Sequence, residues 1–177
     1  MKKLIVMIAA LLAALFIVSC ASTGPTASEM MSSAKNSAPD GALVGQATAK
    51  EKSKDASAKK AEETAKFQLR RAMSFIVKEL VDDAVTAGKL SSGVAEDFRQ
   101  SINVALTRVQ LNGAVKQDSG FGAGDTAWAV YYMEREDVRR AVNAAVDAAK
   151  KEHPAGAFNT DGFNAKYAAA VNREWKN

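Results

Sequence analysis

The sequence predicts a small two-layer α+β domain, in which an antiparallel β-hairpin and one further strand pack against a long helix and two to three shorter helices. Two observations predict this class. Apolar residues recur at the three- and four-residue spacing of amphipathic helices over several segments, and a period of two appears in two short segments, 109–115 and 126–133. After the N-terminal region about 135 residues remain, a normal size for one domain.

The first 20 residues have the features of a bacterial export signal. Two lysines precede an uncharged run of about 15 residues, which is shorter than the roughly 20 residues of a membrane-spanning helix. The run ends Ile17-Val18-Ser19-Cys20, which resembles a lipobox, the cleavage site of bacterial lipoproteins. The resemblance implies that the signal peptide, residues 1–19, is removed and that Cys20 becomes an acylated N-terminus.

Two other interpretations of this segment stay open. The chain has one cysteine, which a plain signal peptide would place here by coincidence, and the apolar run would also serve as a short uncleaved anchor. Two or more acyl chains anchor a protein stably, whereas a single chain binds a membrane only marginally. With Ala21 rather than Asp after the cysteine, the lipobox resemblance implies attachment to the cell outer membrane, at its periplasmic face or at the cell surface.

Charge argues against nucleic acid as a partner. The whole chain has 24 Lys+Arg and 20 Asp+Glu, and removing Lys2 and Lys3 leaves 22 basic against 20 acidic residues. A near-neutral chain lacks the basic excess that phosphate binding requires.

The segment after Cys20 is predicted to be a spacer. Residues 20–40 are rich in Ser, Ala and Thr, contain two prolines and show no apolar periodicity, which is typical of a flexible tether. Twenty such residues have a mean reach of about 25 Å, enough to lift a domain clear of the lipid headgroups.

The domain proper, residues 41–150, opens with a candidate strand, "GALVGQATA" at 41–49. Thr48 and Glu51 then match a capping box, which predicts the start of a helix. Apolar residues at helical spacing follow from Ala61 to Ala84, and Gly88 is a typical stop signal. Residues 50–60 have almost no large apolar side chains, and whether they are helical stays open.

The second half of the domain alternates between the two periodicities. A helix is predicted after Ser91 or Ser92, with the inner stripe Val94, Phe98 and Ile102. Residues 109–115 then alternate as a strand, "KQDSGFGAGD" connects, and "TAWAVYYM" at 126–133 completes an antiparallel hairpin. A third helix is expected over about 135–150, with its inward face formed by Val138, Ala141, Val142, Ala145 and Ala149.

The last segment, residues 151–177, is predicted to dock a short helix on the domain. His153-Pro154 breaks the preceding helix, and a new one is expected after Thr160 or Asp161. Aromatic and apolar residues then recur at strict four-residue steps, which favours core packing over sugar stacking. They are Phe163, Tyr167, Val171 and Trp175.

The order of these elements resembles that of the LPP-twenty family of bacterial lipoproteins, whose domain is similar to the amino-terminal domain of the flagellar-ring protein T. The residues that carry the resemblance are "GALVGQATA", "AEETAKFQLRRAMSFIV" and "TAWAVYYMEREDVRRAV", and they span about 41–150. The resemblance implies a small module at the bacterial outer membrane or cell surface. It brings no catalytic residues with it.

No set of residues predicts catalysis, a metal site or a cofactor. "GFGAGD" is followed by a strand, whereas a phosphate-binding loop opens a helix. His153 is the only histidine and lies in a polar turn, so neither a catalytic triad nor a His/Cys metal centre can be assembled. The paired acids are expected on solvated helix faces.

The sequence therefore predicts a non-catalytic lipoprotein with two possible modes of action. The first is protein–protein contact in envelope or surface-structure assembly, and the alternative is a carrier or binding module for a lipid or glycan. For the carrier, the hairpin face with Trp128, Val130 and Tyr132 would line a pocket against the first helix. Candidate contacts to a partner or to lipid headgroups are the arginine pairs Arg70, Arg71, Arg139 and Arg140.

Overall fold

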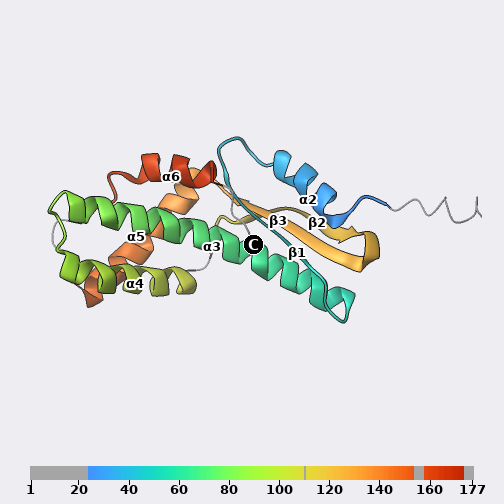
Figure 1. Ribbon diagram of the computed structural model, residues 1–177, viewed down its shortest axis with the longest axis horizontal. Coiled ribbons are helices and arrows are strands. Elements are labelled where there is room, and N and C mark those ends of the chain that lie inside the picture. The colour runs from blue at the N-terminus through green and yellow to red at the C-terminus, as the bar shows by residue number, and fades with distance from the viewer. Residues whose placement is uncertain (1–23, 110, 154–157, 174–177) are drawn as a thin grey trace, which may run out of the picture.

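The computed structural model describes residues 24–109, 111–153 and 158–173. Their elements form an α+β domain, which confirms the predicted class, and Figure 1 shows a three-stranded sheet at one end and a group of helices at the other. The sheet is antiparallel with the order β1-β3-β2. In chain order the elements are α2 (Ala27–Asn36), β1 (Leu43–Ala49), α3 (Lys54–Thr86), α4 (Ser92–Arg108), β2 (Val115–Gly122), the 3₁₀ turn η1 (Ala123–Asp125), β3 (Thr126–Met133), α5 (Arg135–Glu152) and α6 (Phe163–Val171).

The long helix α3 connects the two ends of the molecule. Its first half lies against β1 and β3, and its second half packs with α4 and α6 (Figure 1). At the sheet, β1 crosses so close to α3 that a Cβ on Gly45 would lie 2.1 Å from the Ala65 carbonyl oxygen. The helix ends as predicted, because Gly88 adopts a left-handed φ of 67°.

The helical end has its own continuation of the core. The predicted inward residues of α5 are all buried, and Phe98 of α4 packs edge-to-face on Phe158, with ring centroids 5.1 Å apart. Phe163 and Tyr167 of α6 are also buried, which confirms the docking helix for its described part. Val171 is half-buried, and Trp175 lies outside the described residues.

The tether prediction is wrong for residues 27–36, which form helix α2 on the sheet face opposite α3. Ala27 and Ala34 are buried against Trp128 and Val130, with two methionines between them also in contact. Their spacing is that of an amphipathic helix, and Thr26 with Glu29 forms a true capping box at its start. Small residues sufficed for this contact because the sheet supplies the large side chains.

Three local predictions are also wrong. The second strand does not run over 109–115, because Gly113 turns the chain at φ 96° and β2 begins only at Val115. Thr48 lies in β1, and Ser53 caps α3 instead by accepting a hydrogen bond from the Ala56 N–H. On α4 the inward position belongs to Ala95, whereas Val94 is 37% exposed.

Candidate functional site

Three segments meet at the tip of the β2–β3 hairpin. The Pro25 carbonyl accepts a hydrogen bond from the Ala123 N–H at 3.3 Å, and Gly122 lies directly on the backbone of Thr26 and Ala27. The start of α3 joins them, because Lys54 Nζ lies 2.9 Å from the Asp125 carboxylate. We call this region, residues 25–27, 50–60 and 121–126, the hairpin end; the described chain begins beside it, just before α2 (Figure 1).

The hairpin end is rich in exposed lysines. Only Lys54 has an ion-pair partner in the described chain, and it also lies 5.6 Å from the centre of the Phe121 ring, which is itself 38% exposed. No carboxylate among the described residues pairs with the other lysines of this end. They are Lys50, Lys52, Lys59 and Lys60, all exposed.

One polar group beyond the hairpin end ties α3 to the sheet. Glu62 accepts hydrogen bonds from Lys116 Nζ at 2.5 Å and from the Tyr131 hydroxyl at 3.0 Å. The Lys116 hydrogen bond lowers the pKa of Glu62 despite its partial burial. Burial, with the Glu62 hydrogen bond, raises the pKa of Tyr131 to about 12. The arrangement holds Glu62 charged and Tyr131 neutral, which suits a structural bond.

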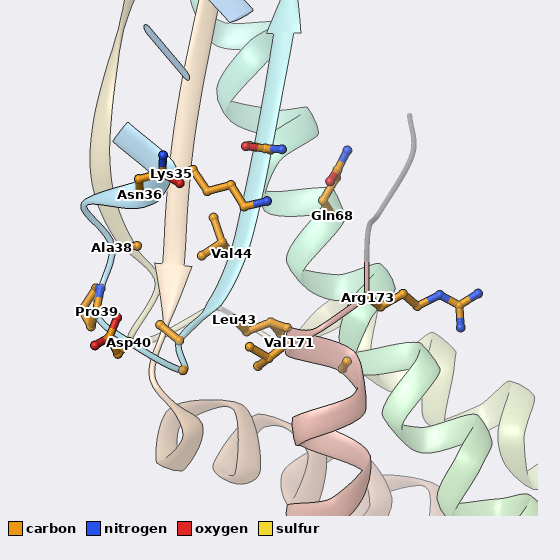
Figure 2. Close-up of a pocket in the computed structure, with 14 residues that line it drawn as sticks. Lys35, Asn36, Ala38, Pro39, Asp40, Leu43, Val44, Gln68, Val171 and Arg173 are labelled. Atoms are coloured by element: carbon orange, nitrogen blue, oxygen red, sulfur yellow. The ribbon is translucent and has the colours of Figure 1, made fainter. Parts of the chain in front are cut away.

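Two adjoining hollows lie beside the loop that joins α2 to β1. Their volumes are about 310 and 590 Å³, and residues 39–42 and Val171 line both. Figure 2 shows the smaller one, with Lys35 on one side and Gln68 and Arg173 on the other. Next to it the Tyr167 hydroxyl donates to the Gly41 carbonyl at 2.8 Å, which fastens α6 to the start of β1. The hollows have a mixed polar and apolar lining and no arrangement that indicates a reaction.

The predicted ligand-binding residues lie on a different surface from the one expected. Alternate β3 residues face opposite sides as predicted, but Trp128 and Val130 face α2, and it is Ala129, Tyr131 and Met133 that belong to the core formed with α3. The pocket predicted against the first helix is therefore absent from the described chain. Trp128 is 3% exposed and its Nε1 has no hydrogen-bond partner, whereas Tyr132 is half-buried.

The two arginine pairs are not gathered into one site at the hairpin end. Arg70 lies about 24 Å along α3 from Lys54 at 1.5 Å per residue, and Arg71 beside it is exposed. Arg139 donates to Asn164 at 2.7 Å and lies 5.3 Å from the Phe163 ring centre, so that it joins α5 to α6. Arg140 pairs with an aspartate one turn before it on α5.

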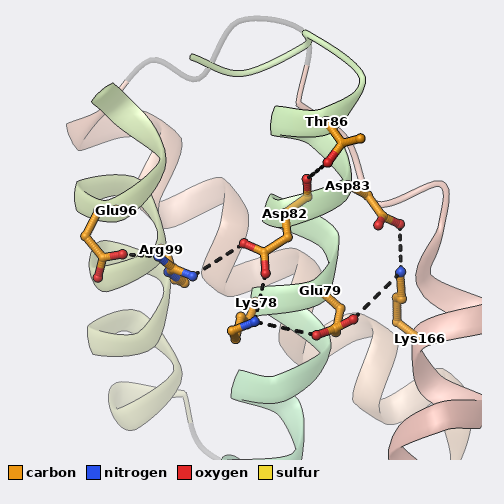
Figure 3. Close-up of polar contacts among 8 residues, drawn as sticks. All are labelled: Lys78, Glu79, Asp82, Asp83, Thr86, Glu96, Arg99 and Lys166. Carbon is orange, nitrogen blue, oxygen red and sulfur yellow. Dashed lines mark hydrogen bonds and ion pairs between the residues drawn. The ribbon is translucent and has the colours of Figure 1, made fainter. Parts of the chain in front are cut away.

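At the helical end several charges of α3, α4 and α6 are paired with one another (Figure 3). Asp82 of α3 accepts hydrogen bonds from Lys78 at 2.8 Å and from Arg99 of α4 at 3.5 Å, and the Asp82 bond raises the pKa of Lys78. Lys166 of α6 lies 2.8 Å from Asp83. These contacts join three helices.

Comparisons with known proteins identify no relative: no family model, no curated protein and no solved structure matches the chain. Within the described ranges, no helix is both long and apolar enough to cross a bilayer. In the same ranges no group of three His, Cys, Asp or Glu side chains could hold a metal ion. Cys20, the predicted lipidation site, lies outside the described residues.

Proposed function

We propose that this protein is a non-catalytic lipoprotein of the bacterial cell outer membrane. It is anchored by acyl chains on Cys20 and acts through protein–protein contacts in envelope or surface-structure assembly. The observation that carries the proposal is the sequence Ile17-Val18-Ser19-Cys20 at the end of a short apolar run that follows two lysines. The resemblance to the LPP-twenty lipoproteins over about 41–150 supports it.

The position of the folded domain supports the same proposal. The first described helix, α2, starts at Ala27, so only six residue steps separate Cys20 from its N-cap Thr26. Six steps span at most about 22 Å when fully extended. A domain on so short a connection stays beside the membrane, where it can contact other envelope proteins.

Replacing Cys20 tests the anchor. In bacteria that express the full-length protein, we expect the wild type to incorporate radiolabelled palmitate, to lose residues 1–19 and to fractionate with membranes. Cys20→Ala should incorporate no palmitate, and it should stay unprocessed or become soluble. If Cys20→Ala is still shortened and still fractionates with membranes, the anchor is not on Cys20.

A second candidate function, a carrier for a lipid or glycan, is favoured by one observation. Trp128 Nε1 is buried without a hydrogen-bond partner, and Trp128 lines a hollow of about 280 Å³ together with Ser33, Ser37 and Gln117. Titrating a Trp175→Phe variant with muropeptides or lipid vesicles tests this, because Trp128 is then the only tryptophan; unchanged emission would argue against a carrier.

A further inference from the structure

We propose that the hairpin end of the domain lies on an anionic lipid surface, with its unpaired lysines at the lipid phosphates and Phe121 at the interface. The proposal rests on the proposed acyl anchor at Cys20 and adds an orientation to it. It names one face of the molecule as the membrane face and leaves the helical end directed away from the lipid.

The first argument is the place where the anchored chain joins the fold. Pro25 is hydrogen-bonded to Ala123 of the hairpin tip, and Gly122 packs on the residues that start α2. The hairpin tip is therefore held within reach of the acylated residue, since six residue steps extend at most about 22 Å. The helical end lies at the far end of α3, a helix of 33 residues and roughly 50 Å at 1.5 Å per residue.

The second argument is charge. The hairpin end has five lysines, at 50, 52, 54, 59 and 60, against three acids, Glu51, Asp55 and Asp125. Asp125 is occupied by Lys54, and no described carboxylate pairs with the other four lysines. Exposed cations without protein partners are free to attract phosphates, and a basic surface adds to an acyl anchor in membrane binding.

The third argument is the exposed aromatic ring at the same tip. Phe121 is 38% exposed on β2, next to Lys54. An aromatic ring flanked by lysines is suited to the boundary between headgroups and acyl chains, because the ring gains from leaving water while the ammonium groups stay at the phosphates. At the helical end Lys78 and Lys166 are instead bound to carboxylates of the protein itself (Figure 3), whereas Lys89 and Lys151 are exposed there.

Site-directed spin labelling tests the orientation. It uses the lipidated protein, produced from the full-length chain and placed in vesicles. A nitroxide is attached at Phe121→Cys and, as the matched control, at Val104→Cys, which is 43% exposed on α4 at the helical end. Acylated Cys20, the chain's only cysteine, takes no label. In vesicles of phosphatidylglycerol and phosphatidylcholine, we expect the nitroxide at residue 121 to be several-fold less accessible to a water-soluble relaxation agent than the nitroxide at residue 104, which should stay fully accessible.

Charge variants separate attraction to the lipid from anchoring. Lys50→Glu with Lys52→Glu should restore water access at residue 121, whereas Lys89→Glu with Lys151→Glu, an equal charge change at exposed sites of the helical end, should not. Vesicles of pure phosphatidylcholine should likewise leave the label at residue 121 accessible to water. Salt at about 1 M should have the same effect on the label at residue 121, because the screening length is then about 3 Å.

The outcomes distinguish the two proposals. Protein that floats with the vesicles but is equally water-accessible at residues 121 and 104 overturns the membrane face and leaves the anchor intact. Protein that does not associate with vesicles, and whose Cys20 thiol takes the label, overturns the anchor itself. Protection at residue 121 that survives both the lysine replacements and pure phosphatidylcholine shows that charge does not orient the domain, and it also contradicts the proposal.

Discussion

Gly45 lies where strand β1 crosses helix α3, and no side chain fits between the two backbones at that point. A Cβ there would lie 2.1 Å from the Ala65 carbonyl oxygen and 3.0 Å from Leu69 Cγ. Both partners are fully buried, so neither can move aside without disturbing the core. The close approach of α3 to the sheet, and with it the thickness of the domain, depends on this glycine.

Replacing Gly45 by alanine should therefore destabilise the fold. We expect Gly45→Ala to lower the free energy of unfolding by about 2–3 kcal/mol, as overpacked core sites do. The matched control is Gly93→Ala in α4, where a Cβ meets nothing within 4 Å. That change should leave stability unchanged or raise it by about 0.5–1 kcal/mol, because alanine favours a helix over glycine. Urea denaturation measures both, and equal effects would contradict the close approach.

Glu62 should make stability depend on pH. Its pKa is lowered in the folded protein by the Lys116 hydrogen bond, so its contribution is present above its unfolded pKa near 4.5 and is lost as the pH falls through the folded value. The stability difference between wild type and Glu62→Gln should thus be largest at neutral pH and shrink below about pH 4. Urea midpoints across this range measure it, with the exposed Glu63→Gln as control. A difference that grows on acidification would be the opposite of this expectation.

At the scale of elements, α2 and β2 are held by the sheet rather than by strong propensities of their own. The buried residues of α2 are two alanines, and β2 has mostly exposed side chains and a bulge between Lys116 and Asp118. A segment of this kind gains stability only from the surface on which it lies. For this reason, we expect a single substitution between α2 and the sheet to be enough to release α2 from the outer face.

A charge placed under α2 should release it from the sheet. Ala34 is buried against the cluster that contains Trp128, so Ala34→Glu would bury an unpaired carboxylate unless the helix moves away. In a Trp175→Phe background, we expect the Trp128 emission to shift to longer wavelength as the ring becomes hydrated. Ser32→Glu, at an exposed position of the same helix that does not line the Trp128 hollow, should leave the emission unchanged. No shift with Ala34→Glu would show that α2 does not cover Trp128 in solution.

At the scale of the whole molecule, α3 holds a sheet end and a helical end at a fixed separation. The described chain begins at the sheet end, and the helical end exposes the paired charges of Figure 3 and a hollow between α4 and α5. If the hairpin end lies on lipid, then the helical end and the hollows beside α6 are the surfaces left for protein partners. Cross-linking in intact cells from label sites on α4 should then capture more protein than from sites at the hairpin tip.

Much of the fold was predictable because its elements have strong periodic patterns. The spacing from Ala61 to Ala84 predicted the core face of α3, and the alternation in 126–133 predicted the two faces of β3. The helix in the supposed tether was missed, although Thr26 and Glu29 match the capping-box pattern, because the alanines that it buries are also typical of linkers. β2 was missed because an edge strand can be built from polar residues and glycine.

By itself the sequence determined the elements with an apolar face of their own, and it predicts the acylation at Cys20, since periodicity and short motifs are local properties. Only the tertiary structure decided that α2 folds onto the sheet, which shortens the connection to the predicted anchor, and that Lys54 meets the hairpin tip. Those arrangements depend on which surfaces the rest of the chain offers, and contacts between residues as distant as Pro25 and Ala123 leave no pattern in either segment alone.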